Sequence, residues 1–229
     1  MEHREYISIR RSYNLVRQDL DSSRRLTFQE LAALCRLYNS KSGLKTSDIA
    51  AYQGCLRPTM THRTKHLEQL GLIGRERGGS DRRNVVCFVS DEGTAYVREV
   101  SERICKRIGV GHSLARTTPE RICRYVDAMG CVECDAGELI LLGLLLIDES
   151  PVSVSRVVDG LGFLQPTVSM SISSLEADGL VVRVPMEGRR SQGVMLTDAG
   201  THAAKELADR ISEVIVRRGA RKKAAAQQA

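Results

Sequence analysis

The sequence predicts a mainly α-helical protein with small β-hairpins, built from two copies of one unit in tandem. Two observations lead to this fold class: an internal repeat across most of the chain, and one order of helix, turn and strand signals that both copies share. The length of 229 residues suits two domains of ordinary size. We therefore expect a first domain over residues 1–110 and a second over residues 111–229.

The internal repeat emerges when the sequence is shifted by 108 positions against itself. Helical leucines and the residues that punctuate secondary structure then coincide in one register, and a deletion of one residue extends the match. The coincident pairs include Glu30 with Glu138, Leu34 with Leu142, Gly54 with Gly162, Leu56 with Leu164, Pro58 with Pro166, Thr59 with Thr167, Glu68 with Glu176, Gly71 with Gly179, Arg75 with Arg183 and, after the deletion, Gly93 with Gly200. So many coincidences at such positions indicate duplication of one unit.

The first copy begins with helical signals. Residues 28–38 carry apolar side chains at helical spacing. Thr46 or Ser47 can cap a short helix that ends near Gly54. The next helix starts at Pro58, whose missing N–H is no loss in a first turn, and stops near residue 70 before a glycine suited to a left-handed cap. Two short helices joined by a glycine-containing turn predict a helix-turn-helix.

A hairpin follows the helix-turn-helix. Residues 72–77 and the β-branched segment 85–89 can pair as strands around the turn cluster at 78–81. Ser90 or Asp91 can then cap a long helix. A hairpin in this place is a wing, so each copy is predicted to be a winged helix-turn-helix domain. The equivalent elements of the second copy are a helix at 138–147, a recognition helix at 165–178, strands at 180–184 and 194–196 and a last helix capped by Thr197. Additional helices are expected at 3–20 and 119–129.

Composition restricts the class of protein. Hydrophobic residues make up 42% of the chain and aromatic residues 4%, so we expect a mainly aliphatic core. The net charge of +6 is a weak indication of an anionic partner. The N-terminal segment is polar and the longest apolar run, residues 139–147, is far below the roughly 20 residues of a membrane span. We expect a cytoplasmic protein without membrane contact, whose seven unevenly spaced cysteines are thiols.

The motifs of both copies resemble the MarR family of bacterial transcription regulators. They are residues 58–61, 67–73, 81–83 and 90–93 in the first copy and 166–169, 175–180, 188–190 and 196–200 in the second. The resemblance implies a recognition helix in the major groove and a wing arginine in the adjacent minor groove of double-stranded DNA. It also implies a dimer made by terminal helices, here replaced by a monomeric pseudo-dimer as among Sar-type relatives. The second copy has Gly188 or Arg189 where the first has the wing residue Asp81.

The candidate DNA contacts lie on the two recognition helices and the two wings. Hydroxyls near a helix start can reach phosphates and base edges, and arginine or lysine can contact guanine; a merely solvated polar face is the alternative interpretation. The candidates are Arg57, Thr59, Thr61, His62, Arg63, Lys65, Arg82 and Arg83 in the first copy and Gln165, Thr167, Ser169, Ser171, Arg189 and Arg190 in the second. Because residues 1–110 hold 20 Lys and Arg against 13 Asp and Glu, and residues 111–229 hold 14 against 15, we expect the first half to dominate.

Other functions have less support in the sequence. No phosphate-binding glycine loop, HExxH motif or paired-carboxylate arrangement is present, so we expect no enzymatic activity, cofactor or metal, and the small-molecule effector stays unknown. Cys131 and Cys134 have metal-like spacing, but a structural zinc site requires four ligands and no second close pair exists. A redox- or metal-responsive regulator acting through these thiols is one alternative. A winged-helix protein-interaction module without DNA binding is the other.

Overall fold

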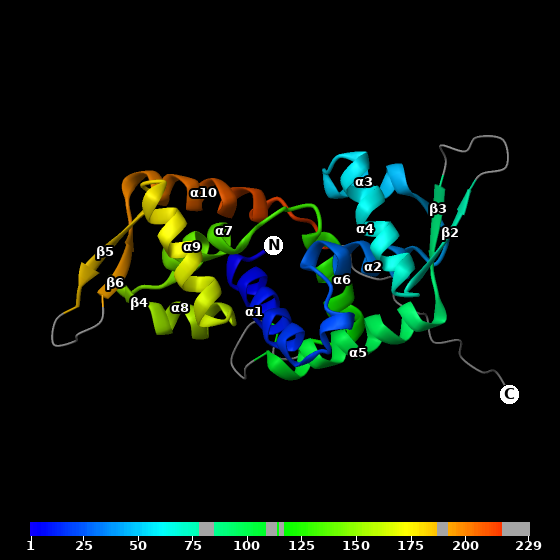
Figure 1. Cartoon of the computed structure of the whole chain (residues 1–229), viewed down its shortest axis with the longest axis horizontal. Helices are drawn as coiled ribbons and strands as arrows, with labels where there is room; N and C mark the ends of the chain where they lie inside the picture. Colours follow the sequence, from blue (N-terminus) through cyan, green and yellow to red (C-terminus); the bar gives the residue numbers. More distant parts are fainter. Residues whose placement is uncertain (78–84, 109–113, 115–116, 187–191, 217–229) are drawn as a thin grey trace, which may run out of the picture.

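The computed structural model describes residues 1–77, 85–108, 114, 117–186 and 192–216, and it is mainly helical with two small antiparallel sheets (Figure 1). The predicted fold class is confirmed. In chain order the elements are α1 (His3–Asp19), the 3₁₀ turn η1 (Ser22–Arg24), α2 (Phe28–Ser40), β1 (Leu44–Lys45), α3 (Thr46–Gln53), α4 (Arg57–Gln69), β2 (Ile73–Arg77), β3 (Val85–Val89), α5 (Asp91–Arg107), α6 (Pro119–Met129), α7 (Ala136–Leu146), β4 (Val152–Ser153), α8 (Val154–Leu161), α9 (Gln165–Ala177), β5 (Val181–Pro185), β6 (Gln192–Leu196) and α10 (Asp198–Ser212).

The elements form two lobes with the same internal order. The first lobe comprises α2 to α5 with β1 to β3, and the second comprises α7 to α10 with β4 to β6. Their three-stranded sheets have the equivalent orders β1-β3-β2 and β4-β6-β5. The hairpins β2–β3 and β5–β6 lie at opposite ends of the molecule (Figure 1). The two-residue strands β1 and β4 were not predicted, because two residues are too short to show an alternating pattern.

Local signals set most helix ends. The carboxylate and hydroxyl of the α2 capping box, Glu30 and Thr27, each accept a hydrogen bond from the other residue's backbone N–H. Gly54 and Gly162 have φ of 64° and 65° and end α3 and α8 in the left-handed conformation, which glycine adopts without steric cost. The expected cap of α3 was wrong: Thr46 and Ser47 are its first two residues and its N-cap is Lys45. The Thr46 hydroxyl instead donates to the carbonyl oxygen of Val85 at 3.2 Å. The sheet therefore takes the hydroxyl that was expected to cap the helix.

Two further helices, α1 and α6, lie outside this repeated order. Helix α1 lies between them (Figure 1), packs on α5 and also contacts α8 and α10. Helix α6 precedes the second lobe in the chain but packs on α2 and α5 of the first lobe. Buried side chains from all of these helices form one continuous hydrophobic cluster, in which Tyr6, Ile9 and Tyr13 of α1 are at most 1% exposed. The lobes therefore share one core.

None of the helices in the described part of the chain has both the length and the apolar character that crossing a bilayer requires.

Candidate nucleic-acid interface

Helix α4 separates an inward apolar face from an outward polar face. Met60, Thr64 and Leu67 are fully buried, three or four residues apart, and the Thr64 hydroxyl donates to the carbonyl oxygen of Met60 at 2.9 Å. This stripe fixes the rotation of the helix, because residues at such spacing share one face. Four of the predicted contact residues lie on the exposed side: Arg57, Thr59, His62 and Lys65. Thr61 is half-buried, and its hydroxyl donates to the carbonyl oxygen of Arg57 at 2.9 Å.

Arg63 differs from its predicted neighbours because its side chain points inward. Only 12% of this side chain is exposed. Its guanidinium donates to Oε1 of Gln53 in α3 at 3.3 Å and to Oε1 of Glu133, between α6 and α7, at 2.8 Å. Because Gln53 is buried, these bonds tie the recognition helix to the helix before it and to the segment that follows α6. The structure therefore gives Arg63 internal partners.

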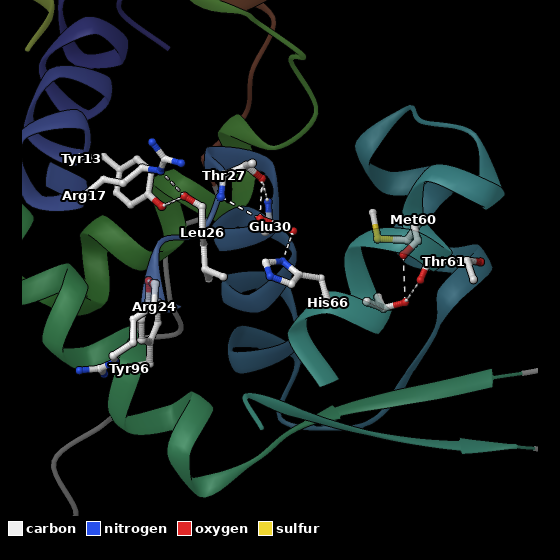
Figure 2. Close-up of polar contacts among 11 residues, drawn as sticks. Tyr13, Arg17, Arg24, Leu26, Thr27, Glu30, Met60, Thr61, His66 and Tyr96 are labelled. Carbon is white, nitrogen blue, oxygen red and sulfur yellow. Dashed lines mark hydrogen bonds and ion pairs between the residues drawn. The ribbon is translucent and has the colours of Figure 1, made fainter. Parts of the chain in front are cut away.

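Glu30 of α2 also holds α4 in place (Figure 2). Its Oε2 accepts hydrogen bonds from the backbone N–H and the hydroxyl of Thr27, and its Oε1 lies 2.6 Å from Nδ1 of His66. Glu30 is nearly buried, whereas the side chain of His66 is 38% exposed. One carboxylate thus caps α2 and also anchors the last turns of α4.

Each hairpin is tied to its recognition helix by an equivalent pair of residues. Nη1 of Arg75 in β2 lies 3.0 Å from Oε2 of Glu68 in α4. In the second lobe, Nε of Arg183 in β5 lies 3.6 Å from Oε2 of Glu176 in α9, and its Nη2 donates to the Ser173 hydroxyl at 3.0 Å. These pairs coincide under the internal repeat, so the hairpin and the helix have a similar relative position in both lobes.

Helix α9 has the same construction but a different outer surface. Val168, Ile172 and Leu175 are buried, in the positions that Met60, Thr64 and Leu67 occupy in α4. The helix contains no lysine or arginine. Its exposed residues include Gln165, Ser169, Met170 and Ser173, whereas Thr167 and Ser171 are half-buried. The outer face of α9 therefore has no cationic side chain of its own, and its one charged residue is Glu176.

A shallow polar pocket of about 680 Å³ adjoins this face of α9. Hydroxyl and amide side chains of α8, α9 and β6 line it together with Arg183: Ser155, Gln165, Ser169, Ser173 and Gln192 are among them. Such groups can donate and accept hydrogen bonds without adding charge.

Helix α1 holds the turn between α8 and α9. Arg11 Nε donates to the carbonyl oxygen of Asp159 at 2.7 Å, and Asn14 Nδ2 donates to that of Leu161 at 2.9 Å. Gln18 Nε2 donates to the carbonyl oxygen of Gly162 at 2.7 Å. The last carbonyls of a helix lack partners within the helix, so three side chains of α1 serve as an external cap for α8.

Both recognition helices begin at an exposed leucine that the sequence analysis did not select. Leu56 is the N-cap of α4 and is 76% exposed; Leu164 is the N-cap of α9 and is 57% exposed. Neither side chain can accept a hydrogen bond from the first turn. A leucine two residues before the helix-starting proline, repeated in both copies, was the signal available in the sequence.

The four wing arginines that were predicted to contact DNA, Arg82, Arg83, Arg189 and Arg190, lie outside the described residues.

The thiols singled out by spacing are weakly acidic. Desolvation raises the pKa of Cys134 to about 11, although the nearby Arg10 guanidinium lowers it in part. Desolvation also raises the pKa of Cys131, whose Sγ donates to the carbonyl oxygen of Ala128 at 3.0 Å. Metal binding and rapid oxidation require the thiolate, so both environments disfavour these reactions. Among the described residues no group of three or more His, Cys, Asp or Glu side chains is placed to hold a metal ion.

Comparison with known proteins finds a family match within the first lobe. Residues 26–85, which contain α2 to α4 and the first strand of the hairpin, match the MarR family. A solved structure with similarity is the crystal structure of the YusO protein from Bacillus subtilis, with 25% sequence identity and a TM-score of 0.34. The match covers 44% of this chain and 66% of that chain, slightly under two thirds of its length. No curated protein matches the chain.

Proposed function

We propose that this protein is a sequence-specific, DNA-binding transcription regulator of the MarR type. The observation that carries the proposal is the outward face of α4, where Arg57, Thr59, His62 and Lys65 are exposed on a helix fixed from behind. Hydroxyl and cationic side chains of this kind bind phosphates and base edges. The match of residues 26–85 to the MarR family supports the same function. We propose that α4 enters the major groove while Arg82 and Arg83 of the wing reach the minor groove.

The second lobe serves as the covalent partner of the first. Its equivalent element order and its matching Arg183–Glu176 pair support a tandem of two winged helix-turn-helix units in one monomeric chain. Its contacts to DNA come from α9 and from the second wing, through Gln165, Thr167, Ser169, Ser171, Arg189 and Arg190. Because α9 has no cationic residue, the first unit contributes more of the affinity. A regulator of this kind acts in the bacterial cytoplasm, where the chromosome lies.

Arg63 has a positioning role in this scheme. Its internal hydrogen bonds to Gln53 and Glu133 hold α4 in place, and the neighbouring Lys65 supplies cationic contact from the exposed side.

Binding across a salt series tests the function. The purified chain is titrated with duplex DNA from its own upstream region at 50 to 200 mM salt. Phosphate contacts release counterions, so we expect the affinity to fall about tenfold or more over this range. The matched variant Lys65→Ala should bind more weakly and show a shallower salt slope. Absence of binding at the lowest salt would refute the regulator and favour a protein-interaction module.

Sedimentation at micromolar concentration tests the one-chain assembly. We expect a single species near 25.3 kDa, the mass of one chain. A tight dimer would contradict the proposal, because the assembly would then contain four winged helix-turn-helix units.

A further inference from the structure

The two exposed N-cap leucines are unusual within this chain. In six other helices the N-cap side chain accepts a hydrogen bond from the first turn; these caps are Thr27, Ser90, Thr118, Asp135, Ser153 and Thr197. Leucine is among the poorest N-cap residues because it offers no acceptor. Yet Leu56 and Leu164 occupy this position in α4 and α9, with 76% and 57% of their surfaces exposed. A local role in stability does not account for them.

Both recognition helices have this leucine, although the other exposed residues of α4 and α9 differ. The residue after Leu56 is Arg57, whereas the residue after Leu164 is Gln165, and the exposed His62 of α4 corresponds to Met170 in α9. Equivalent exposure at the tips of both helices indicates a requirement that both units share.

We propose that Leu56 and Leu164 each contact the C5-methyl group of a thymine, one in each half-site of the bound DNA. This inference rests on the proposed DNA-binding function, in which the start of each recognition helix enters the major groove. The thymine methyl is the apolar group that base pairs present in that groove, and it distinguishes thymine from cytosine. A leucine at the helix tip would bury its exposed surface against this methyl. Both half-sites should therefore contain a required thymine, even though their neighbouring bases differ.

Removal of single methyl groups from the DNA tests the contact. A duplex that the protein binds is selected from a random library, and each thymine is replaced singly by uracil, which lacks only the methyl. We expect about a fourfold loss of affinity at one position in each half-site, equal to about 0.8 kcal/mol when tenfold is 1.4 kcal/mol. The two positions should lie about one helical turn apart.

Substitution of each leucine assigns the position. With Leu56→Ser the thymine and uracil duplexes should bind equally at one half-site while the other keeps its preference, and Leu164→Ser should show the reverse. Leu56→Met, which keeps an apolar contact, should retain the preference. Serine also restores an N-cap, so both serine variants should melt about 2–4 °C higher while they bind more weakly. The control Ile215→Ser removes another exposed apolar side chain, 81% exposed, and should leave thymine preference unchanged.

The outcomes separate the two proposals. If the wild-type chain selects no duplex, the proposed function fails. If it binds DNA but no uracil substitution weakens binding, or if the serine variants keep the wild-type thymine preference, the function stands and this inference is overturned.

Discussion

Arg63→Ala separates positioning of α4 from contact with DNA. The substitution removes the donor to Gln53 Oε1, at 3.3 Å, and the ion pair with Glu133, at 2.8 Å. Gln53 is 3% exposed, and leaving a buried acceptor without its donor costs about 1–3 kcal/mol. The Glu133 side chain is 70% exposed, so the ion pair itself contributes at most about 1 kcal/mol. We expect the free energy of unfolding to fall by about 1–3 kcal/mol, most of it through Gln53.

Urea denaturation and DNA binding in a salt series measure the two roles independently. A positioning residue makes no phosphate contact, so Arg63→Ala should weaken binding while the salt slope stays at its wild-type value. Lys65→Ala should instead leave stability unchanged and reduce the slope by about 1. Glu133→Ala, the matched control, should cost less than about 1 kcal/mol of stability because it leaves the Gln53 bond intact. Wild-type stability in Arg63→Ala together with a reduced salt slope would refute the reasoning and return Arg63 to the DNA surface.

Four further predictions follow from the same residues. A Cβ at Gly93 would overlap the carbonyl oxygen of Leu72, and a Cβ at Gly200 would overlap that of Leu180. Either glycine→Ala change should therefore lower the free energy of unfolding, measured by urea denaturation, by about 1–3 kcal/mol. A change within about 0.5 kcal/mol, the scatter of ordinary surface substitutions, would contradict this packing. Because the pKa of Cys134 is raised, the folded state keeps the thiol proton at pH values where the unfolded state loses it. The free energy of unfolding should therefore fall as pH rises from the usual thiol pKa to about 11, and it should fall less in Cys134→Ser. Equal pH dependence of stability in the wild type and in Cys134→Ser would contradict this. Replacing both Cys131 and Cys134 by Ser should leave DNA affinity unchanged with and without peroxide, whereas peroxide-induced release that only the wild type shows would establish a redox role. Arg82→Ala and Arg83→Ala should each cost about 1–3 kcal/mol of binding, and Arg189→Ala and Arg190→Ala distinctly less, so equal losses would refute the dominance of the first unit.

Sequence patterns predicted those features that depend on neighbouring residues. Helix α4 follows from Pro58 at its start, Gly71 just beyond its end and an apolar stripe between them, and the duplicate in α9 repeats each signal. The orientation of Arg63 could also have been inferred, since it lies three residues after Met60 and four before Leu67, beside the buried stripe. The prediction that Arg63 contacts DNA overlooked this position beside the stripe.

Features that depend on distant segments could not be predicted in this way. Thr118 and Pro119 indicate where α6 begins, but no local pattern indicates that the helix packs on α2 and α5 of the preceding lobe. Likewise Arg11, Asn14 and Gln18 have the spacing of an ordinary polar helix face, and their carbonyl partners lie about 150 residues away. The partner of Arg63, Glu133, lies 70 residues further along the chain.

Helices α1 and α6 make the two halves of the chain depend on each other. A chain shortened to residues 1–110 would lose α6 and expose the surfaces of α2 and α5 that it covers. A chain restricted to residues 111–229 would leave the last carbonyls of α8 without the three donors of α1. Each lobe therefore depends on a segment that lies beside the other lobe in the sequence, so deletion of either half leaves an incomplete fold. The outer faces of α4 and α9 can change independently by substitution, whereas the contacts of α1 and α6 constrain both halves of the chain together.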